Sequence, residues 1–215
     1  MDNIIIVGAG RHGAELYTYL KDEEDLNFVG FIDELKKRGR YEGSKIVGNF
    51  NDLEEHLAKH RDIIFKYITA TGDNGLRQRI VRKIEGIEEK NIIPYTLIYK
   101  NVVMGKDVEI GEGTCLAPGV ILTTNINIGK HCIVNVKTSI SHDCVVGDFT
   151  SINPGVTICG NVKIGKECFI GAGATIIDKV VIGKNVVIGA GASVISDVPD
   201  DVTVVGVPAK IVKQR

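Results

Sequence analysis

Bulky aliphatic residues recur at every sixth position over the second half of the chain. Seventeen successive hexapeptides hold this frame, at Ile98, Met104, Ile110, Leu116, Leu122, Ile128, Val134, Ile140, Val146, Ile152, Ile158, Ile164, Ile170, Ile176, Ile182, Ile188 and Val194. The next residue is Gly or Ala in most repeats, and the fifth position is small or β-branched. A period of six fits neither an amphipathic helix nor an alternating strand, but it is typical of a parallel β-helix with one short strand per hexapeptide.

Three hexapeptides make one triangular coil of eighteen residues, so the repeat predicts five to six coils. The aliphatic and fifth positions should point inward, while Gly, Asn and Asp supply the turns at the corners. Residues eighteen apart should then lie on the same corner of neighbouring coils.

The first part of the chain has a different pattern, typical of a small parallel α/β unit. The pattern predicts strands at 3–7, 28–32 and 62–69 and helices at 14–20, 52–59 and 74–90. The change of period predicts two domains, a Rossmann-like domain over 1–94 and a β-helix domain over 95–215.

A glycine motif, Gly8-x-Gly10-x-x-Gly13, follows the first expected strand and opens a helix. In that position backbone N–H groups and the helix N-terminus can hold a diphosphate, and Asp33, after the next strand, could bind a ribose hydroxyl. With three expected strands the second half of a dinucleotide site is missing, so a single nucleoside diphosphate fits better than a nicotinamide cofactor. A tight turn without a ligand stays the alternative.

The composition indicates which classes of partner and which cellular compartment to expect. The formal net charge is −1 and no basic stripe occurs, so we expect neither a nucleic-acid nor a membrane partner. No apolar run reaches the length of a membrane span, and the first ten residues read as a strand and turn rather than a signal peptide, which favours a cytoplasmic protein. All five cysteines lie in the repeat without a CxxC, so we expect small core residues rather than disulfides or metal ligands.

Function should come from residues that interrupt the repeat, and His142 is the main candidate. It stands in the segment Ser-His-Asp-Cys-Val-Val-Gly-Asp-Phe at 141–149. With the glycine turn, Phe-Ile-Asp at 31–33, Gly-Asp-Asn at 72–74 and the closing Val-Gly-Val-Pro-Ala-Lys at 205–210, this segment resembles the bacterial nucleotide-sugar acetyltransferases. That group of hexapeptide-repeat acyltransferases includes the sialic acid O-acetyltransferases and the bacillosamine-pathway N-acetyltransferases. The resemblance covers nearly the whole chain.

The resemblance implies a left-handed β-helix, with His142 as general base and Asp143 raising its basicity. The chemistry needs such a pair, because an amine or hydroxyl that attacks a thioester must lose a proton. Counting eighteen from His142 reaches Gly160, whose N–H, uncovered by a side chain, could donate to the thioester oxyanion. An ordinary turn glycine is the alternative for Gly160.

The resemblance also assigns ligand contacts. Coenzyme A contacts map onto Ser151, Ala172 and Ala190, the last two one coil apart and on another corner from His142; the position of Ser151 is often histidine in relatives. In related trimers the two corners meet between subunits, so we expect a homotrimer. The expected substrate contacts are Gly10, Arg11, His12, Asp33, Glu34, Gly72 and Asn135.

The leading interpretation is acetyl transfer from acetyl-coenzyme A to the amino group of a nucleotide-linked 4-amino-4,6-dideoxy sugar, without a metal. The alternatives are a sugar O-acetyltransferase of the sialic acid type and a non-catalytic trimer that binds a nucleotide sugar. A zinc carbonic anhydrase on the same scaffold needs three histidine ligands, whereas the repeat offers only His131 and His142. The sugar, and the choice among UDP, dTDP and GDP, stay open at this point.

Overall fold

The computed structural model describes residues 1–21 and 23–215. Those residues form two compact units, Met1–Tyr95 and Thr96–Arg215, and each is described by itself.

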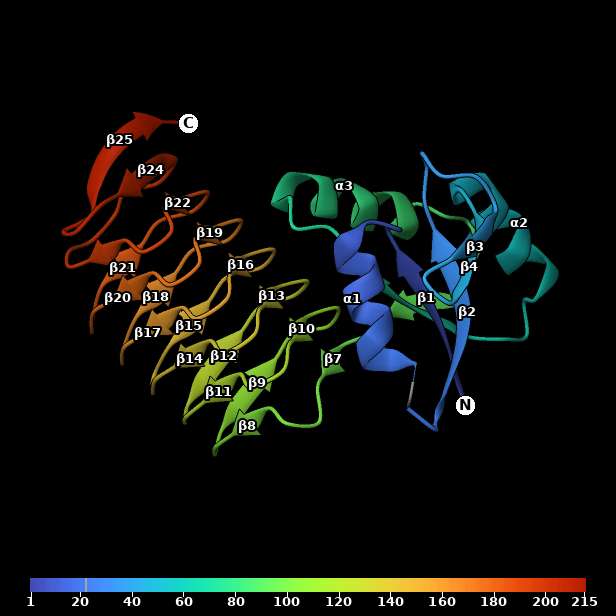
Figure 1. The fold of residues 1–215 in the computed structure, drawn as a ribbon, viewed down its shortest axis with the longest axis horizontal. Helices are drawn as coiled ribbons and strands as arrows, with labels where there is room; N and C mark the ends of the chain where they lie inside the picture. Colours follow the sequence, from blue (N-terminus) through green and yellow to red (C-terminus); the bar gives the residue numbers. More distant parts are fainter. Residues whose placement is uncertain (22) are drawn as a thin grey trace. The chain divides into compact units, whose positions relative to one another are not determined.

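The first unit is a sheet with helices packed on it (Figure 1). Its elements are β1 (Asp2–Val7), α1 (Arg11–Leu20), β2 (Leu26–Ile32), β3 (Gly39–Tyr41), β4 (Ser44–Gly48), α2 (Phe50–Lys59), β5 (Phe65–Thr69), α3 (Asn74–Glu85) and β6 (Ile92–Pro94). The strand order is β3-β4-β2-β1-β5-β6, and every pair is parallel except β3 with β4. The apolar run of β1 explains its central place, because Ile4, Ile5 and Ile6 are fully buried.

Three sequence expectations for this unit were wrong. The sheet has six strands rather than three, because β6 and the polar β3–β4 hairpin join it. The hairpin turns at Glu42 and Gly43, both with positive φ, a turn suited to two-residue connections. Helix α3 ends at Glu85 rather than at residue 90, since Gly86 caps it. Strand β5 begins at Phe65 rather than at residue 62, after a turn.

The second unit is a parallel β-helix whose strands stack into three sheets (Figure 1). The first sheet contains β7 (Leu97–Ile98), β10 (Cys115–Leu116), β13 (Ile133–Val134), β16 (Ser151–Ile152), β19 (Phe169–Ile170), β22 (Val187–Ile188), β24 (Val202–Val205) and the antiparallel β25 (Lys210–Gln214). The second sheet contains β8 (Val103–Met104), β11 (Ile121–Leu122), β14 (Ser139–Ile140), β17 (Thr157–Ile158), β20 (Thr175–Ile176) and β23 (Ser193–Val194). The third sheet contains β9 (Val108–Ile110), β12 (Ile126–Ile128), β15 (Val145–Val146), β18 (Lys163–Ile164) and β21 (Val181–Ile182).

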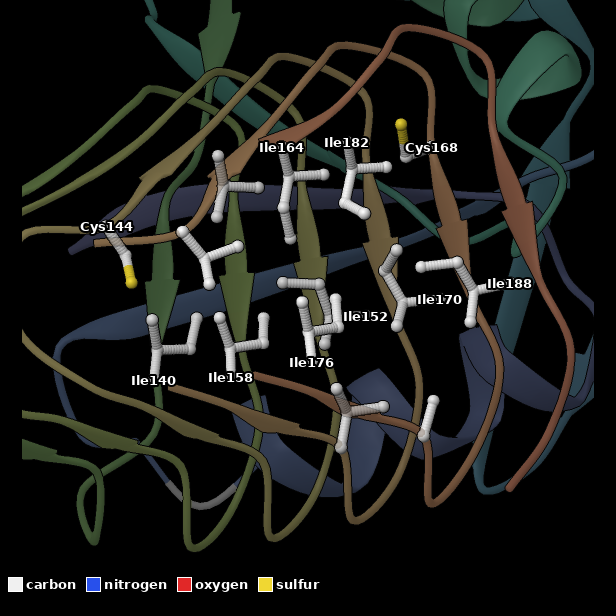
Figure 2. Packing of buried hydrophobic residues seen from close by; sticks show 14 of the residues in the cluster. Ile140, Cys144, Ile152, Ile158, Ile164, Cys168, Ile170, Ile176, Ile182 and Ile188 are labelled. Atoms are coloured by element: carbon white, nitrogen blue, oxygen red, sulfur yellow. The ribbon is translucent and has the colours of Figure 1, made fainter. Parts of the chain in front are cut away.

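The six-residue frame sets the register of all three sheets. Ile140 pairs with Ile158, and Ile158 pairs with Ile176, each eighteen residues on. Figure 2 shows these side chains stacked in a row inside the coils, beside a second row that contains Ile152, Ile170 and Ile188. All of them are fully buried, so the stacked rows form the hydrophobic core. The predicted parallel β-helix is therefore confirmed.

The cysteines behave as small core residues. Cys132, Cys144 and Cys168, at the inward fifth position, are buried, and no disulfide joins any of the five cysteines within the described part of the chain. Burial raises the pKa of the Cys168 thiol to about 11, because a thiolate would lose its hydration there. Among the described residues, no helix is both long enough and apolar enough to span a bilayer.

Candidate active site

His142 and Asp143 occupy the turn that joins β14 to β15. Asp143 has a φ of 60°, in the left-handed region that short polar residues tolerate. Its N–H donates to the carbonyl of Thr124 on the preceding coil, at 3.1 Å. The corner thus fixes the backbone of this pair while both side chains point to solvent, with 55% of the His142 side chain and 43% of the Asp143 side chain exposed.

The two side chains are hydrogen-bonded to each other. His142 Nδ1 lies 2.7 Å from Asp143 Oδ2. Hydrogen bonds from Asn125 and from His142 hold the pKa of the Asp143 carboxyl below its ordinary value, so it is ionised at neutral pH. An ionised carboxylate only accepts, so Nδ1 carries a proton, and in the neutral ring the other nitrogen, Nε2, presents a lone pair. This arrangement gives the imidazole the form that a general base needs.

Asn125 is a further member of this site and was not expected from the sequence. Asn125 is on the same corner one coil earlier, and its Nδ2 donates to Asp143 Oδ1 at 2.5 Å. The spacing of eighteen residues between Asn125 and Asp143 was the signal that could have found it.

Gly160 lies directly against the imidazole, as the count of eighteen from His142 predicted. A Cβ added at Gly160 would stand 2.6 Å from Cε1 and 2.7 Å from Nε2 of His142. Gly160 is buried, and the ring of His142 fills the space that the missing side chain leaves. Among the described residues, no backbone group accepts a hydrogen bond from that N–H.

The residues expected to bind coenzyme A lie away from the His142 corner. Ala172 and Ala190 are exposed on turns that follow β19 and β22, one coil apart and at the corner between the first and second sheets. Ser151 lies on β16 of the first sheet and is buried. Asn135 precedes the turn after β13, on the same corner as the alanines, and its Oδ1 accepts from its neighbour's N–H at 2.7 Å.

The glycine turn places Gly10, Arg11 and His12 at the start of α1. Gly10 is the N-cap, and a Cβ there would meet no atom within 4 Å, so the turn is open at this point. The Arg11 side chain is 95% exposed and lies 3.5 Å from the carboxylate of Glu42. His12 Nδ1 lies 3.1 Å from Glu15, while its Nε2 is buried without a hydrogen-bond partner. The hydrogen bond from His12 is the main cause that lowers the pKa of Glu15.

Asp33 forms hydrogen bonds with the backbone of the glycine turn and of the segment that follows Asp33. Its Oδ2 accepts from the N–H of Ala9 at 2.7 Å, and its Oδ1 accepts from Leu35 and Lys36. The Lys36 ammonium donates to the carbonyl of Ala9 and lies 4.1 Å from the centre of the Tyr41 ring. Both carboxylate oxygens of Asp33 therefore accept hydrogen bonds from the backbone, and Lys36, which was not expected at this site from the sequence, brings positive charge to the turn.

The two remaining predicted residues lie farther along the same unit. Glu34 is exposed and forms an ion pair with Lys83 of α3 at 2.8 Å. Gly72 is exposed with open space around it, just before Asp73, which caps α3 by accepting from the N–H of Leu76 at 2.6 Å.

Two family models match the chain. The PglD N-terminal domain matches residues 3–84, and the bacterial transferase hexapeptide, a set of six repeats, matches residues 161–196. A curated relative, UDP-N-acetylbacillosamine N-acetyltransferase from Bacillus subtilis (strain 168), is 31% identical over 118 residues, which are 54% of this chain and 51% of that protein. The chain therefore spans about half the length of this curated relative.

Solved structures match the chain over nearly all of its length. One is a histidine-to-asparagine mutant of perosamine N-acetyltransferase from Caulobacter crescentus in complex with CoA and GDP-perosamine, with 29% identity, a TM-score of 0.89, and coverage of 100% of this chain and 98% of that chain. Another is WeeI from Acinetobacter baumannii AYE, with 30% identity, a TM-score of 0.85, and coverage of 99% and 100%. The chain belongs to the PglD-type hexapeptide-repeat nucleotide-sugar N-acetyltransferase family.

Proposed function

We propose that this protein transfers the acetyl group of acetyl-coenzyme A to the amino group of a nucleoside-diphosphate-linked amino sugar. The observation that carries the proposal is the pair of His142 and Asp143, joined at 2.7 Å on an exposed corner of the β-helix with Nε2 free to accept a proton. The relatives support the same chemistry, since one is named an N-acetyltransferase of a UDP-sugar and another binds CoA and GDP-perosamine.

The reaction follows from the properties of this pair. The amine nitrogen attacks the thioester carbonyl, and a C–N bond forms as Nε2 of His142 takes a proton from the nitrogen. The C–S bond then breaks, and the leaving thiolate takes up the proton. Asp143 stays ionised and stabilises the imidazolium between these two steps, while Gly160 provides the space in which the ring sits.

The first unit, proposed to span residues 1–94, would recognise the nucleotide part of the acceptor. The open N-cap at Gly10 lets a diphosphate approach the first N–H groups of α1. Arg11 and Lys36 add positive charge beside this turn, and His12 offers a buried nitrogen without a partner. Asp33 shapes the turn through its bonds to backbone N–H groups, so we assign it a supporting role rather than a ribose contact.

The β-helix, proposed to span residues 95–215, would hold the acetyl donor. Ala172 and Ala190 are small and exposed, so a thin pantetheine arm can lie against the backbone at their corner. Because His142 is on another corner, donor and base can meet when two copies of the chain adjoin. We therefore propose a homotrimer with active sites shared between subunits. In it, Asn135 lies on the same corner as Ala172 and Ala190, and Ser151 lies on the first sheet, which leads into that corner.

The experiment tests both donor and acceptor chemistry. The purified protein is incubated with acetyl-coenzyme A and UDP-, dTDP- or GDP-linked 4-amino-4,6-dideoxy sugars, and free thiol and product mass are followed. We expect thiol release with at least one of these sugars, and a product that gains one acetyl group. With the matched sugar that has a hydroxyl in place of the amine, we expect no thiol release from acetyl-coenzyme A. Release only with the hydroxyl sugar would favour O-acetylation, and no release with any acceptor would contradict the proposal.

A further inference from the structure

The carboxylate of Asp143 is held from two sides by two different donors. Its Oδ2 is 2.7 Å from His142 Nδ1, and its Oδ1 is 2.5 Å from Asn125 Nδ2. The three side chains thus form one hydrogen-bonded row, Asn125 to Asp143 to His142, that crosses from one coil to the next.

The shape of the corner explains how this row forms. Asn125 and Asp143 occupy the same turn position on neighbouring coils, with φ values of 53° and 60°. Neighbouring coils of a β-helix are one strand spacing apart, about 4.8 Å, which brings short side chains on one corner within hydrogen-bond distance. Asparagine suits this position for two reasons: it tolerates a positive φ, and its side chain carries an N–H donor.

An exposed carboxylate needs a second contact to keep a fixed orientation. The Asp143 side chain is 43% exposed, so water competes for both of its oxygens. When Asn125 holds Oδ1, the carboxylate plane is fixed and Oδ2 points at Nδ1 of His142. The same bond favours the ionised carboxylate, which is the form that keeps the proton on Nδ1.

We propose that Asn125 is a positioning residue of the acetyl-transfer reaction, which orients the Asp143 carboxylate and through it the base His142. The inference rests on the proposed function. Asn125 itself touches neither ring nitrogen in this arrangement, so its effect passes through Asp143. Loss of the amide donor should lower kcat about tenfold or more, as with partners that orient the ligands of metal sites. The KM values for both substrates should change little, because no substrate contact is removed.

The variant N125D separates donation from turn conformation. Aspartate has nearly the same shape and tolerates positive φ, but it replaces the amide donor with a second carboxylate beside Asp143. Asn185 provides a matched control, because it has a φ of 52° and donates through Nδ2 to Asp201 Oδ1 at 2.8 Å, on another corner. We expect N125D to lose turnover and N185D to keep wild-type turnover, with similar melting temperatures for the two variants.

A double-mutant cycle tests whether the effect passes through Asp143. The kcat values of N125A, D143A and N125A/D143A are compared with that of the wild type. If Asn125 acts by orienting the carboxylate, N125A lowers kcat in the wild type but adds no loss once D143A has removed the carboxylate. A loss from N125A that is equally large in the D143A background would overturn the inference, as would wild-type turnover in N125D.

The variant H142A keeps this inference distinct from the proposed function. If H142A abolishes turnover while the Asn125 variants are fully active, the function stands and the role of Asn125 falls. If H142A keeps wild-type turnover, the proposed mechanism falls, and with it the reason to assign Asn125 a role.

Discussion

Replacing Gly160 by alanine should disable the site while leaving the fold intact. The Cβ of Gly160→Ala would stand 2.6 Å from Cε1, 2.7 Å from Nε2 and 3.1 Å from Nδ1 of His142. Ordinary contacts between such atoms begin at about 3.5 Å. The imidazole must therefore move by about 1 Å, and it can do so because it is an exposed side chain rather than backbone.

The size of the loss follows from that displacement. A misplacement of about 1 Å in a reacting group can cost about 10²-fold in rate. Because each tenfold change in rate corresponds to about 1.4 kcal/mol, the barrier for acetyl transfer should rise by about 3 kcal/mol. The bond from His142 Nδ1 to Asp143 should be disturbed as well, since the whole ring is pushed outward.

A second glycine in the same β-helix offers the contrasting case. A Cβ at Gly147 would stand 2.5 Å from the backbone nitrogen of Lys166 on the next coil, and backbone cannot move aside without separating the coils. Gly147→Ala should therefore lower the melting temperature strongly, with overpacking costing at least about 1–3 kcal/mol in the free energy of unfolding. Gly160→Ala should melt close to the wild type.

The assay combines thermal unfolding with thiol release at saturating acetyl-coenzyme A. We expect kcat of Gly160→Ala to fall about 100-fold at a nearly unchanged melting temperature. Wild-type turnover in Gly160→Ala would refute the reasoning, because it would show that the imidazole need not occupy the observed position. A loss of turnover that merely tracks unfolding would refute it too.

Three further predictions concern other parts of the chain. Gly10→Leu should raise the KM for the nucleotide sugar at least about tenfold and leave the KM for acetyl-coenzyme A unchanged, because the leucine side chain would fill the open N-cap of α1. If the wild type and Gly10→Leu have the same KM for the nucleotide sugar, the turn has only a structural role. Burial raises the pKa of the Cys168 thiol from its ordinary value of 9.0 to about 11 in the folded chain, so its contribution to stability is complete below pH 9 and is lost as pH rises toward 11. Unfolding measurements should show a steeper loss of stability over this window in the wild type than in Cys168→Ala, and identical slopes would contradict the burial argument. Light scattering should give about three times the chain mass of 23.3 kDa, and a fully active monomer would exclude shared sites.

The sequence predicted the β-helix well because each of its coils repeats one local rule. An aliphatic residue in every sixth position fixes which side chains face inward, and the stacking of equivalent positions then fixes the register. The same arithmetic placed Gly160 beside His142 and put Ala172 and Ala190 on a different corner. The periodicity of the sequence therefore predicted both the fold of the second unit and the corners of the β-helix on which the candidate site residues lie.

The sequence failed where individual hydrogen bonds decide the structure. The two oxygens of Asp33 accept hydrogen bonds from the backbone N–H groups of Ala9, Leu35 and Lys36, and no periodic pattern records which partner a carboxylate takes. The eighteen-residue spacing places Asn125 on the same corner as Asp143, but spacing alone does not show which residues of a corner form a hydrogen bond. The β3–β4 hairpin was missed because its strands are short and lack the apolar alternation that marks a half-buried strand.

A comparison of the wild type with His142→Ala tests whether His142 accepts the proton of the attacking amine. Thiol release is measured for the wild type and His142→Ala at saturating acetyl-coenzyme A and amino-sugar acceptor, with binding of acetyl-coenzyme A measured in parallel. We expect kcat of His142→Ala to fall by about 10²–10⁴-fold while binding of acetyl-coenzyme A stays nearly unchanged, because the base and the proposed cofactor residues lie on different corners. Wild-type turnover in His142→Ala would show that His142 is not the base.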